Sequence, residues 1–232
     1  MEISLINPHH IGWSKTKLNK KSIDFIWDAV NESQKEENKH SAKGGLVGNI
    51  SRSSYLVDKD NWFLDNILSY HANLHFQSSN NTFPVQFYHP SKPTSPENIG
   101  DSEDEIKYLL TSWWVNYQYK HEFNPTHYHT GLYSFVIWLK IPYNIMDEHM
   151  QPFLKGVKPI DRRAGSFAFT VRDMLGDLSS YNYEPEEGVM LFFPARLEHC
   201  VYPFYTSDEP RITIAGNIAL DLNSTIPPNI NF

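Results

Sequence analysis

Two histidines near the middle of the chain have a spacing that suits metal binding. His127 and His129 lie in the polar segment 124–131, between two runs rich in aromatic and β-branched residues. Side chains two positions apart point to the same face of an extended strand, so both imidazoles can reach one ion. Taken alone, a His-x-His pair is more often a pair of hydrogen-bonded histidines than a metal site, so other residues must decide.

A third histidine and an arginine follow in the C-terminal part of the chain. His199 comes shortly after the apolar run 189–194, and Arg211 opens the last apolar run, where it shares one strand face with Thr213 and Asn217. A buried arginine needs an anionic partner. Either an acidic side chain or a bound carboxylate can fill that role, and a bound carboxylate would accept two charge-assisted hydrogen bonds.

The elements that must position these residues are predicted to be strands. Runs rich in apolar, aromatic and β-branched residues occupy 109–119, 133–141, 167–171, 189–193 and 212–220. No helical periodicity of useful length separates them, so the strands are expected to pair in antiparallel fashion. Consecutive antiparallel strands imply a sandwich or a barrel, and a jelly roll is the natural candidate.

The first third of the chain predicts helices. Apolar residues recur at i, i+3, i+4 and i+7 from position 23 to 30, on one face of an amphipathic helix. A second helix is expected to begin near Asp58 or Asp60, because aspartate suits an N-cap. This second helix places His71 and His75 four positions apart, but the pair lacks the glutamate of a metalloprotease helix, so we expect it to be structural.

Two other segments in the N-terminal half have an unusual composition. The glycine cluster 44–48 lacks the Gly-Lys-Ser/Thr ending of a phosphate-binding loop, so that function is rejected. Residues 78–105 combine polar residues, prolines and an acidic run, which is typical of a long irregular connection. Connections of this length are usually active-site lids or disordered segments, and both interpretations stay open.

Composition excludes several classes of protein. The 232 residues include 20 Lys plus Arg and 27 Asp plus Glu, and the net charge of −7 argues against binding nucleic acid mainly through its phosphates. A single cysteine excludes an internal disulfide and a cysteine-based metal cluster. The sequence shows neither a signal-peptide pattern nor an apolar run that could cross a bilayer, so we expect a cytoplasmic protein (in the host cell if phage-encoded) without a membrane partner.

The residues that could do chemistry, taken in chain order, resemble the motifs of one known family. A His-x-His pair, a distal histidine and an Arg-x-Thr pair follow one another as in the Fe(II)- and 2-oxoglutarate-dependent oxygenases. In this sequence they are His127, His129, His199, Arg211 and Thr213. The run 188–194 is similar to the segment before the distal histidine of prolyl hydroxylases. The segments 114–116 and 125–129 are most similar to a branch of the superfamily that is common in marine bacteria and their phages.

This resemblance covers roughly residues 106–222 and implies a fold, cofactors and a reaction. The fold would be mainly β, a cupin-like double-stranded β-helix. Residues 1–105 would be a helical extension with a long loop packed on the barrel, 106–222 the catalytic core and 223–232 a C-terminal tail. The cofactors would be Fe(II), 2-oxoglutarate and O2. The enzyme would be a dioxygenase that hydroxylates a C–H bond of an unidentified small molecule or protein, with release of succinate and carbon dioxide.

The resemblance also assigns roles to individual residues. The metal ligands would be His127, His129 and His199. Arg211 would pair with the far carboxylate of 2-oxoglutarate, and Thr213 would assist it. Further contacts to the cofactor are expected from Asn116, Trp138 and Asn217.

One position departs from the usual pattern of the family. The standard iron site has two histidines and one carboxylate, and here His129 stands where the carboxylate is expected. Glu122 and Glu198 are the alternatives, although Glu198 would point away from the neighbouring His199 on a strand. We expect His129 to be the third ligand.

Two rival functions also fit parts of the pattern. A cupin-like metal-dependent isomerase would use the same histidines without needing Arg211. A non-catalytic jelly roll, such as a carbohydrate-binding or virion module, would use the abundant aromatic residues as stacking platforms. A metal assay separates this module from the two enzymes, and a 2-oxoglutarate titration separates the oxygenase from the isomerase. A homodimer is one candidate assembly.

Overall fold

A computed structural model of the chain describes residues 3–6, 12–35, 40–45, 47–78, 88–89, 92–93, 107–173 and 175–221. The predicted connection 78–105 falls almost wholly outside the described residues, apart from Ser78 and the paired strands β4 (Tyr88–His89) and β5 (Lys92–Pro93). The expectation of an active-site lid there, and the predicted tail 223–232, therefore lie outside the described residues.

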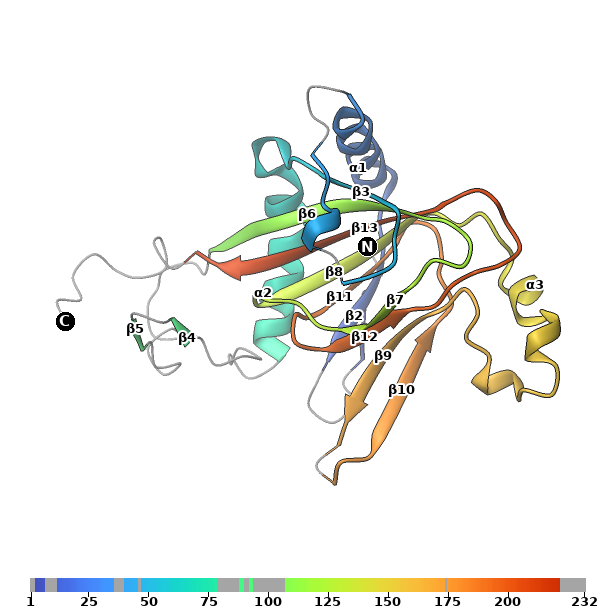
Figure 1. Cartoon of the computed structure of the whole chain (residues 1–232). Coiled ribbons are helices and arrows are strands. Elements are labelled where there is room, and N and C mark those ends of the chain that lie inside the picture. Colours follow the sequence, from blue (N-terminus) through green and yellow to red (C-terminus); the bar gives the residue numbers. More distant parts are fainter. Residues whose placement is uncertain are drawn as a thin grey trace, which may run out of the picture.

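Two antiparallel sheets form the body of the protein (Figure 1). The larger sheet has the order β1 (Ile3–Ile6), β2 (Trp13–Lys17), β11 (Val189–Pro194), β8 (Tyr133–Lys140), β13 (Arg211–Leu220), β6 (Tyr108–Gln118) and β3 (Arg52–Tyr55). The smaller sheet has the order β10 (Leu178–Tyr183), β9 (Phe167–Arg172), β12 (Glu198–Val201) and β7 (Asn124–His127). From β6 to β13 the chain passes back and forth between the two sheets. This is the double-stranded β-helix, a jelly roll, that the sequence predicted.

Helices cover the outer face of the larger sheet. They are α1 (Lys20–Ser33) and a second helical segment made of a 3-10 turn (Lys59–Asn61), a π-helical turn (Leu64–Leu68) and α2 (Ser69–Ser78). Asn19 caps α1 by accepting a hydrogen bond from the Ser22 amide (2.9 Å). The Asp58 carboxylate accepts bonds from two amides of the second segment. Apolar side chains of both segments join one core with the outward-facing side chains of the larger sheet.

The N-terminal third also contributes strands, which the sequence analysis did not predict. Strand β2 pairs with β11, and β3 pairs with β6, so both belong to the larger sheet. In β2, Trp13, Ser14 and Thr16 are buried while Lys17 is exposed. The usual alternation of apolar and polar residues is not visible in this five-residue strand, because two of its buried residues, Ser14 and Thr16, carry hydroxyl groups instead of apolar side chains.

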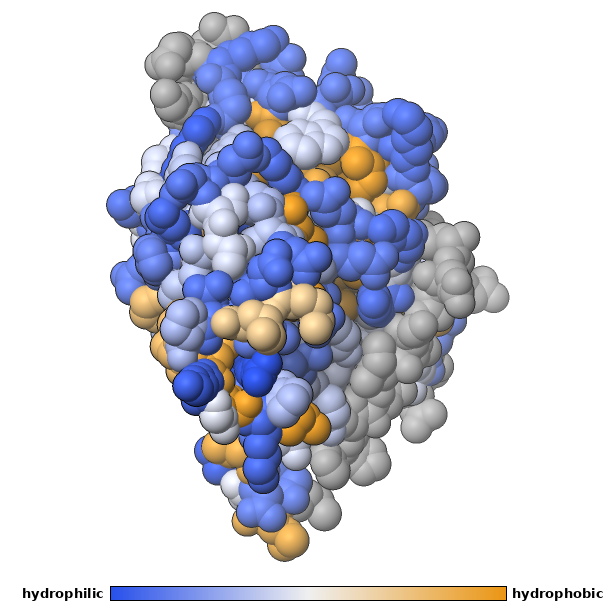
Figure 2. Space-filling view, turned by 90° about the vertical axis from the view of Figure 1, so that its right-hand side faces the viewer, coloured by the Kyte–Doolittle hydropathy of each residue, from blue (hydrophilic) through white to orange (hydrophobic). Residues whose placement is uncertain are grey.

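The connection between β8 and β9 lies at one end of the molecule. It holds α3 (Ile145–His149) and the 3-10 turns Pro152–Leu154 and Pro159–Asp161. Figure 2 shows this side of the protein as mostly hydrophilic, with apolar side chains in small groups. Among the described residues, no helix has the length and apolar character needed to cross a membrane.

Candidate active site

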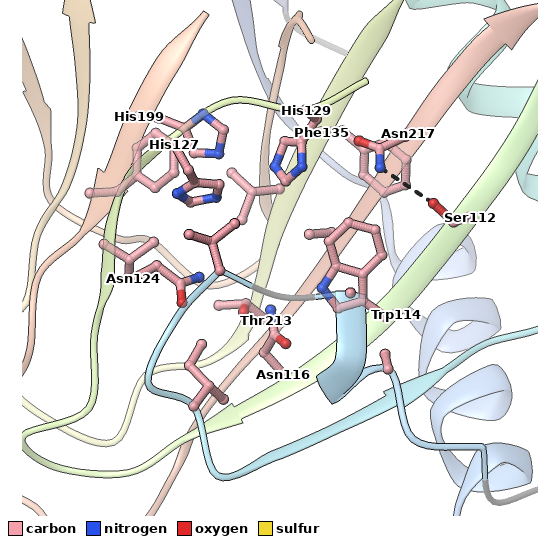
Figure 3. Close-up of a pocket in the computed structure, with 18 of the residues that line it drawn as sticks. Ser112, Trp114, Asn116, Asn124, His127, His129, Phe135, His199, Thr213 and Asn217 are labelled. Carbon is pink, nitrogen blue, oxygen red and sulfur yellow. Dashed lines mark hydrogen bonds between the residues drawn. The ribbon is translucent and has the colours of Figure 1, made fainter. Parts of the chain in front are cut away.

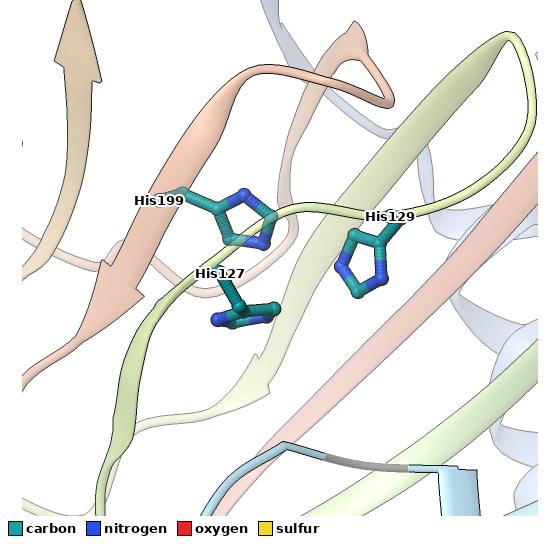
Figure 4. A group of neighbouring side chains, drawn as sticks. All are labelled: His127, His129 and His199. Atoms are coloured by element: carbon teal, nitrogen blue, oxygen red, sulfur yellow. The ribbon is translucent and has the colours of Figure 1, made fainter.

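Three histidines converge between the two sheets (Figure 4). His127 ends β7, His129 lies two residues further along, and His199 is the register partner of His127 on β12. Their ligand nitrogens all lie within 4.8 Å of one another. Within the described part of the chain, they are the only group of three or more metal-binding side chains gathered this closely.

Backbone carbonyls orient two of these rings. His127 Nδ1 lies 2.7 Å from the Pro125 carbonyl oxygen, and His199 Nδ1 lies 2.9 Å from the Leu197 carbonyl oxygen. A carbonyl can only accept, so each Nδ1 carries the hydrogen and donates it. Each Nε2 therefore keeps its lone pair, which is the usual state of a histidine that binds a metal.

Burial keeps the three imidazoles neutral. It lowers the pKa of His129 to about 4, with a further contribution from His127. Burial likewise lowers the pKa of His127 and holds the pKa of His199 well below its usual range. An imidazole must be neutral to coordinate a metal, so the cluster is ready to bind an ion at neutral pH.

Neither alternative carboxylate joins the cluster. Glu122 accepts hydrogen bonds from the backbone amides of Ser51 (3.2 Å) and Tyr119 (2.9 Å), which hold it in the turn after β6. Glu198 is exposed, while His199 beside it is buried, so the two point to opposite faces of β12. The donor set is therefore three neutral imidazoles, which suit Fe(II) among other divalent ions. Because no carboxylate offsets the charge of the ion, an anionic chelator would be favoured at its open positions.

A cavity of about 270 Å³ opens in front of the histidines (Figure 3). Its walls are mainly aromatic, aliphatic, amide and hydroxyl side chains. None of the described residues that line it is Asp, Glu, Lys or Arg. The predicted cofactor contacts Asn116, Trp138, Thr213 and Asn217 all lie in this wall.

Strands β6 and β13 supply a ladder of paired residues along the cavity. The register pairs are Gln118 with Arg211, Asn116 with Thr213, Trp114 with Ala215, and Ser112 with Asn217. The first three residues on the β6 side are nearly inaccessible, with 2%, 5% and 6% of their surfaces exposed. Ser112, Ala215 and Asn217 are more exposed. The ladder thus runs from a closed end at Arg211 to an open end at Asn217.

Arg211 is fully buried at the closed end but does not itself line the cavity. Its terminal nitrogens donate to Tyr143 Oη (2.6 Å), to the carbonyls of Gly165 (2.8 Å) and Tyr202 (3.2 Å), and to Gln118 Oε1 (2.5 Å). All four acceptors are uncharged. Among the described residues no carboxylate pairs with this guanidinium, so a buried positive charge stands without a counter-ion.

The glycine cluster that the sequence analysis left without a function forms part of the cavity wall. We call residues 41–50 the strap, of which Leu46 lies outside the described residues. Ala42, Gly45, Val47 and Ile50 of the strap line the cavity. A Cβ on Gly48 would lie 1.3 Å from Asn124 Oδ1, so only glycine allows the strap to pass this close to β7. The glycines at positions 45 and 48 were the sequence signal that could have indicated this contact, because glycine permits such a close approach of the backbone.

Comparisons with known proteins agree with this geometry. Residues 112–217 match a family model described as "Putative 2OG-Fe(II) oxygenase". The chain is similar in structure to a Pseudomonas putida prolyl-4-hydroxylase, with a TM-score of 0.50, 13% identity, and coverage of 90% of this chain and 92% of that one. It is also similar to SnoK, a non-heme alpha-ketoglutarate-dependent carbocyclase from nogalamycin biosynthesis, with a TM-score of 0.51, 12% identity, and coverage of 91% and 80%. At such low identity these likenesses concern the fold alone. No curated protein sequence matches the chain.

Proposed function

The chain belongs to the Fe(II)- and 2-oxoglutarate-dependent oxygenase superfamily, and from that premise we propose that it is a dioxygenase that hydroxylates a C–H bond of its substrate. The observation that carries the proposal is the cluster of three neutral histidines in front of a cavity. Fe(II), 2-oxoglutarate and O2 supply the oxidising power, and the co-substrate leaves as succinate and carbon dioxide.

We assign the metal to His127, His129 and His199. The two carbonyl-bound rings keep Nε2 free to coordinate, and the three histidines offer ligand nitrogens that lie within 4.8 Å of one another. Three imidazoles hold a divalent ion without cancelling its charge. The negatively charged keto-acid end of 2-oxoglutarate would offset that charge, so this donor set favours binding of the co-substrate.

We assign the far carboxylate of 2-oxoglutarate to the closed end of the ladder, at Arg211 and Thr213. A buried guanidinium cannot lose its proton and gains most from an anionic partner. Gln118 lines the cavity and accepts a hydrogen bond from Arg211, so its amide oxygen is the group with which this carboxylate would compete. The aromatic rings around the histidines, including Trp138, Phe167 and Phe193, exclude water from the reacting end of the cavity.

One observation favours the rival isomerase. The four terminal hydrogen bonds of Arg211 already go to protein acceptors, so the arginine also satisfies a purely structural role. An isomerase of the cupin type would bind the metal in the same way and would not respond to 2-oxoglutarate.

The test has two steps. The first is the metal content of His127→Ala and His199→Ala after purification in chelator, with the exposed His40→Ala as the control. We expect both variants to lose the metal, because two remaining ligands hold a divalent ion poorly, while His40→Ala keeps it. Full metal content in either variant would contradict the assignment of that ligand. The second step is an anaerobic titration of the iron form with 2-oxoglutarate, and the absence of binding would favour the isomerase.

A further inference from the structure

The open end of the ladder carries a small network of hydroxyl and amide groups. Ser134 Oγ donates to Asn217 Oδ1 (2.8 Å), and Asn217 Nδ2 donates to Ser112 Oγ (3.3 Å), as drawn in Figure 3 for the second bond. In this arrangement the Asn217 amide oxygen accepts from Ser134 and the amide nitrogen donates to Ser112. As a result, the Asn217 amide nitrogen keeps a second hydrogen, and Ser112, which acts as an acceptor, keeps its own hydroxyl hydrogen.

A third donor lies on the next rung toward the histidines. Trp114 Nε1 is buried and has no hydrogen-bond partner among the described residues. Only 6% of the Trp114 surface is exposed, and in Figure 3 its indole nitrogen faces the cavity. The indole ring lies 6.0 Å from the His129 ring, between centroids. A buried indole N–H can only donate, so a ligand that offers an acceptor here would satisfy its hydrogen-bonding capacity.

The charge of this region limits what that ligand can be. None of the described side chains that line the cavity is acidic, lysine or arginine, and the guanidinium of Arg211 lies three rungs away at the closed end. A charged group entering the open end would lose water without gaining a counter-ion. A carbonyl oxygen accepts hydrogen bonds and carries no net charge, so carbonyl groups match the donors of Ser112, Asn217 and Trp114.

We propose that Ser112, Asn217 and Trp114 form a substrate subsite that donates hydrogen bonds to the carbonyl groups of an uncharged ligand such as an amide. The inference deepens the proposed function and rests on it for the statement that the ligand is the substrate. Asn217, which was expected from the sequence to contact the cofactor, would instead contact the substrate. Both termini of the 2-oxoglutarate molecule are carboxylates, so the co-substrate is a poor match for this end of the cavity.

The test uses two probes of nearly equal size. N-acetylglycinamide is uncharged, and N-acetylglycine carries a carboxylate in place of the terminal amide. The indole N–H resonances of the full-length protein, loaded with Zn²⁺ as a diamagnetic ion and with 2-oxoglutarate, are followed during titration with each probe. The Trp114→Phe variant assigns the Trp114 signal among the 6 tryptophans. We expect the amide to move the Trp114 signal downfield and to bind about tenfold more tightly than the acid.

Matched variants test the donors. Asn217→Asp retains an acceptor for Ser134 and removes the amide donors, and Ser112→Ala removes the hydroxyl. Each should weaken amide binding by about tenfold. Asn182→Asp on the exposed side of β10 makes the same change outside the cavity and should have no effect. The remaining indole signals show whether each variant is folded.

Three results would overturn the inference: equal or tighter binding of the acid, amide binding that leaves the Trp114 signal unmoved, or amide binding unchanged in Asn217→Asp. The spectra also separate the two proposals. If 2-oxoglutarate shifts none of the indole resonances, the proposed function fails. The amide titration, repeated without Zn²⁺ and 2-oxoglutarate, still measures binding at the subsite in that case.

Discussion

The Gln118→Glu substitution should neutralise Arg211, the proposed partner of the far carboxylate of 2-oxoglutarate, with a carboxylate of the protein itself. Arg211 Nη2 donates to Gln118 Oε1 over 2.5 Å, and both side chains are almost fully buried. A glutamate has the same shape as glutamine, so the introduced carboxylate would meet the guanidinium directly. The far carboxylate of 2-oxoglutarate would then face a compensated charge and a new negative neighbour.

The size of the effect follows from the geometry. Two unit charges about 4 Å apart interact by about 4 kcal/mol at an effective dielectric constant of about 20. Removing a partner from a buried charge pair costs about 2–4 kcal/mol in comparable cases. At about 1.4 kcal/mol per factor of ten, the affinity for 2-oxoglutarate should fall by about 30- to 700-fold. The amide donor bonds of Gln118 to the carbonyls of Glu122 and Tyr202 are lost as well, so stability must be measured separately.

The assay is anaerobic titration calorimetry of the iron-loaded protein with 2-oxoglutarate, with urea denaturation of the same samples. Gln34→Glu is the control, because Gln34 also accepts a hydrogen bond from an arginine, Arg52, but at the surface. It changes the net charge equally and should leave 2-oxoglutarate binding unaltered. An unchanged affinity in a folded Gln118→Glu variant would refute the reasoning and leave Arg211 as a structural residue.

Three further predictions concern the ligand set, the packing and the acid stability. His129→Asp should keep the metal and His129→Ala should lose part of it, as measured by metal content after dialysis against chelator; a His129→Ala variant that binds like the parent would direct the search to Glu122. Gly216→Ala should lower the free energy of unfolding in urea by about 1–3 kcal/mol, because the new Cβ would lie 2.6 Å from the Phe135 ring. Gly44→Ala, which meets nothing within 4 Å, should have little effect. Burial lowers the pKa of His75 to about 4. Between about pH 6.5 and pH 4 this histidine is therefore protonated in the unfolded chain but neutral in the folded chain, so the free energy of unfolding should fall as the pH is lowered through this range. His75→Gln should remove about 1 kcal/mol per pH unit of that slope, and a slope equal to the parent's would contradict this origin.

The strands that carry the site could be predicted because their sequence signal is local. Strands β8 and β11 are buried along nearly their whole length, so each reads as a continuous apolar run. The predicted run 109–119 differs from β6 by one residue at each end. The approach of three histidines in space was also expected, and the structure shows it. Their role as metal ligands stays a prediction.

Other features depend on contacts that no local pattern records. Strand β2 holds serine and threonine toward the core and reads as a polar loop. The two buried histidines of α2 both lie within hydrogen-bonding distance of Ser14 Oγ on β2 (3.3 and 3.2 Å), a pairing across about sixty positions of sequence. The arginine in an apolar run suggested an anionic partner, whereas its nearest acceptors are uncharged oxygens contributed by four separate segments.

The strap described above is attached to the barrel chiefly through its main chain. The Asn49 amide donates to the Phe123 carbonyl (2.9 Å), and the Ala42 amide donates to the Ser53 carbonyl (3.3 Å). These main-chain bonds do not depend on which side chains stand at positions 42, 47 and 50, of which Val47 is exposed while Ala42 and Ile50 are buried and must keep a similar volume. These positions are also remote in sequence from the histidines. A library restricted to them offers a route to new substrate preferences while the three histidines proposed as metal ligands stay unchanged, and the same division would let natural selection vary the cavity in small steps.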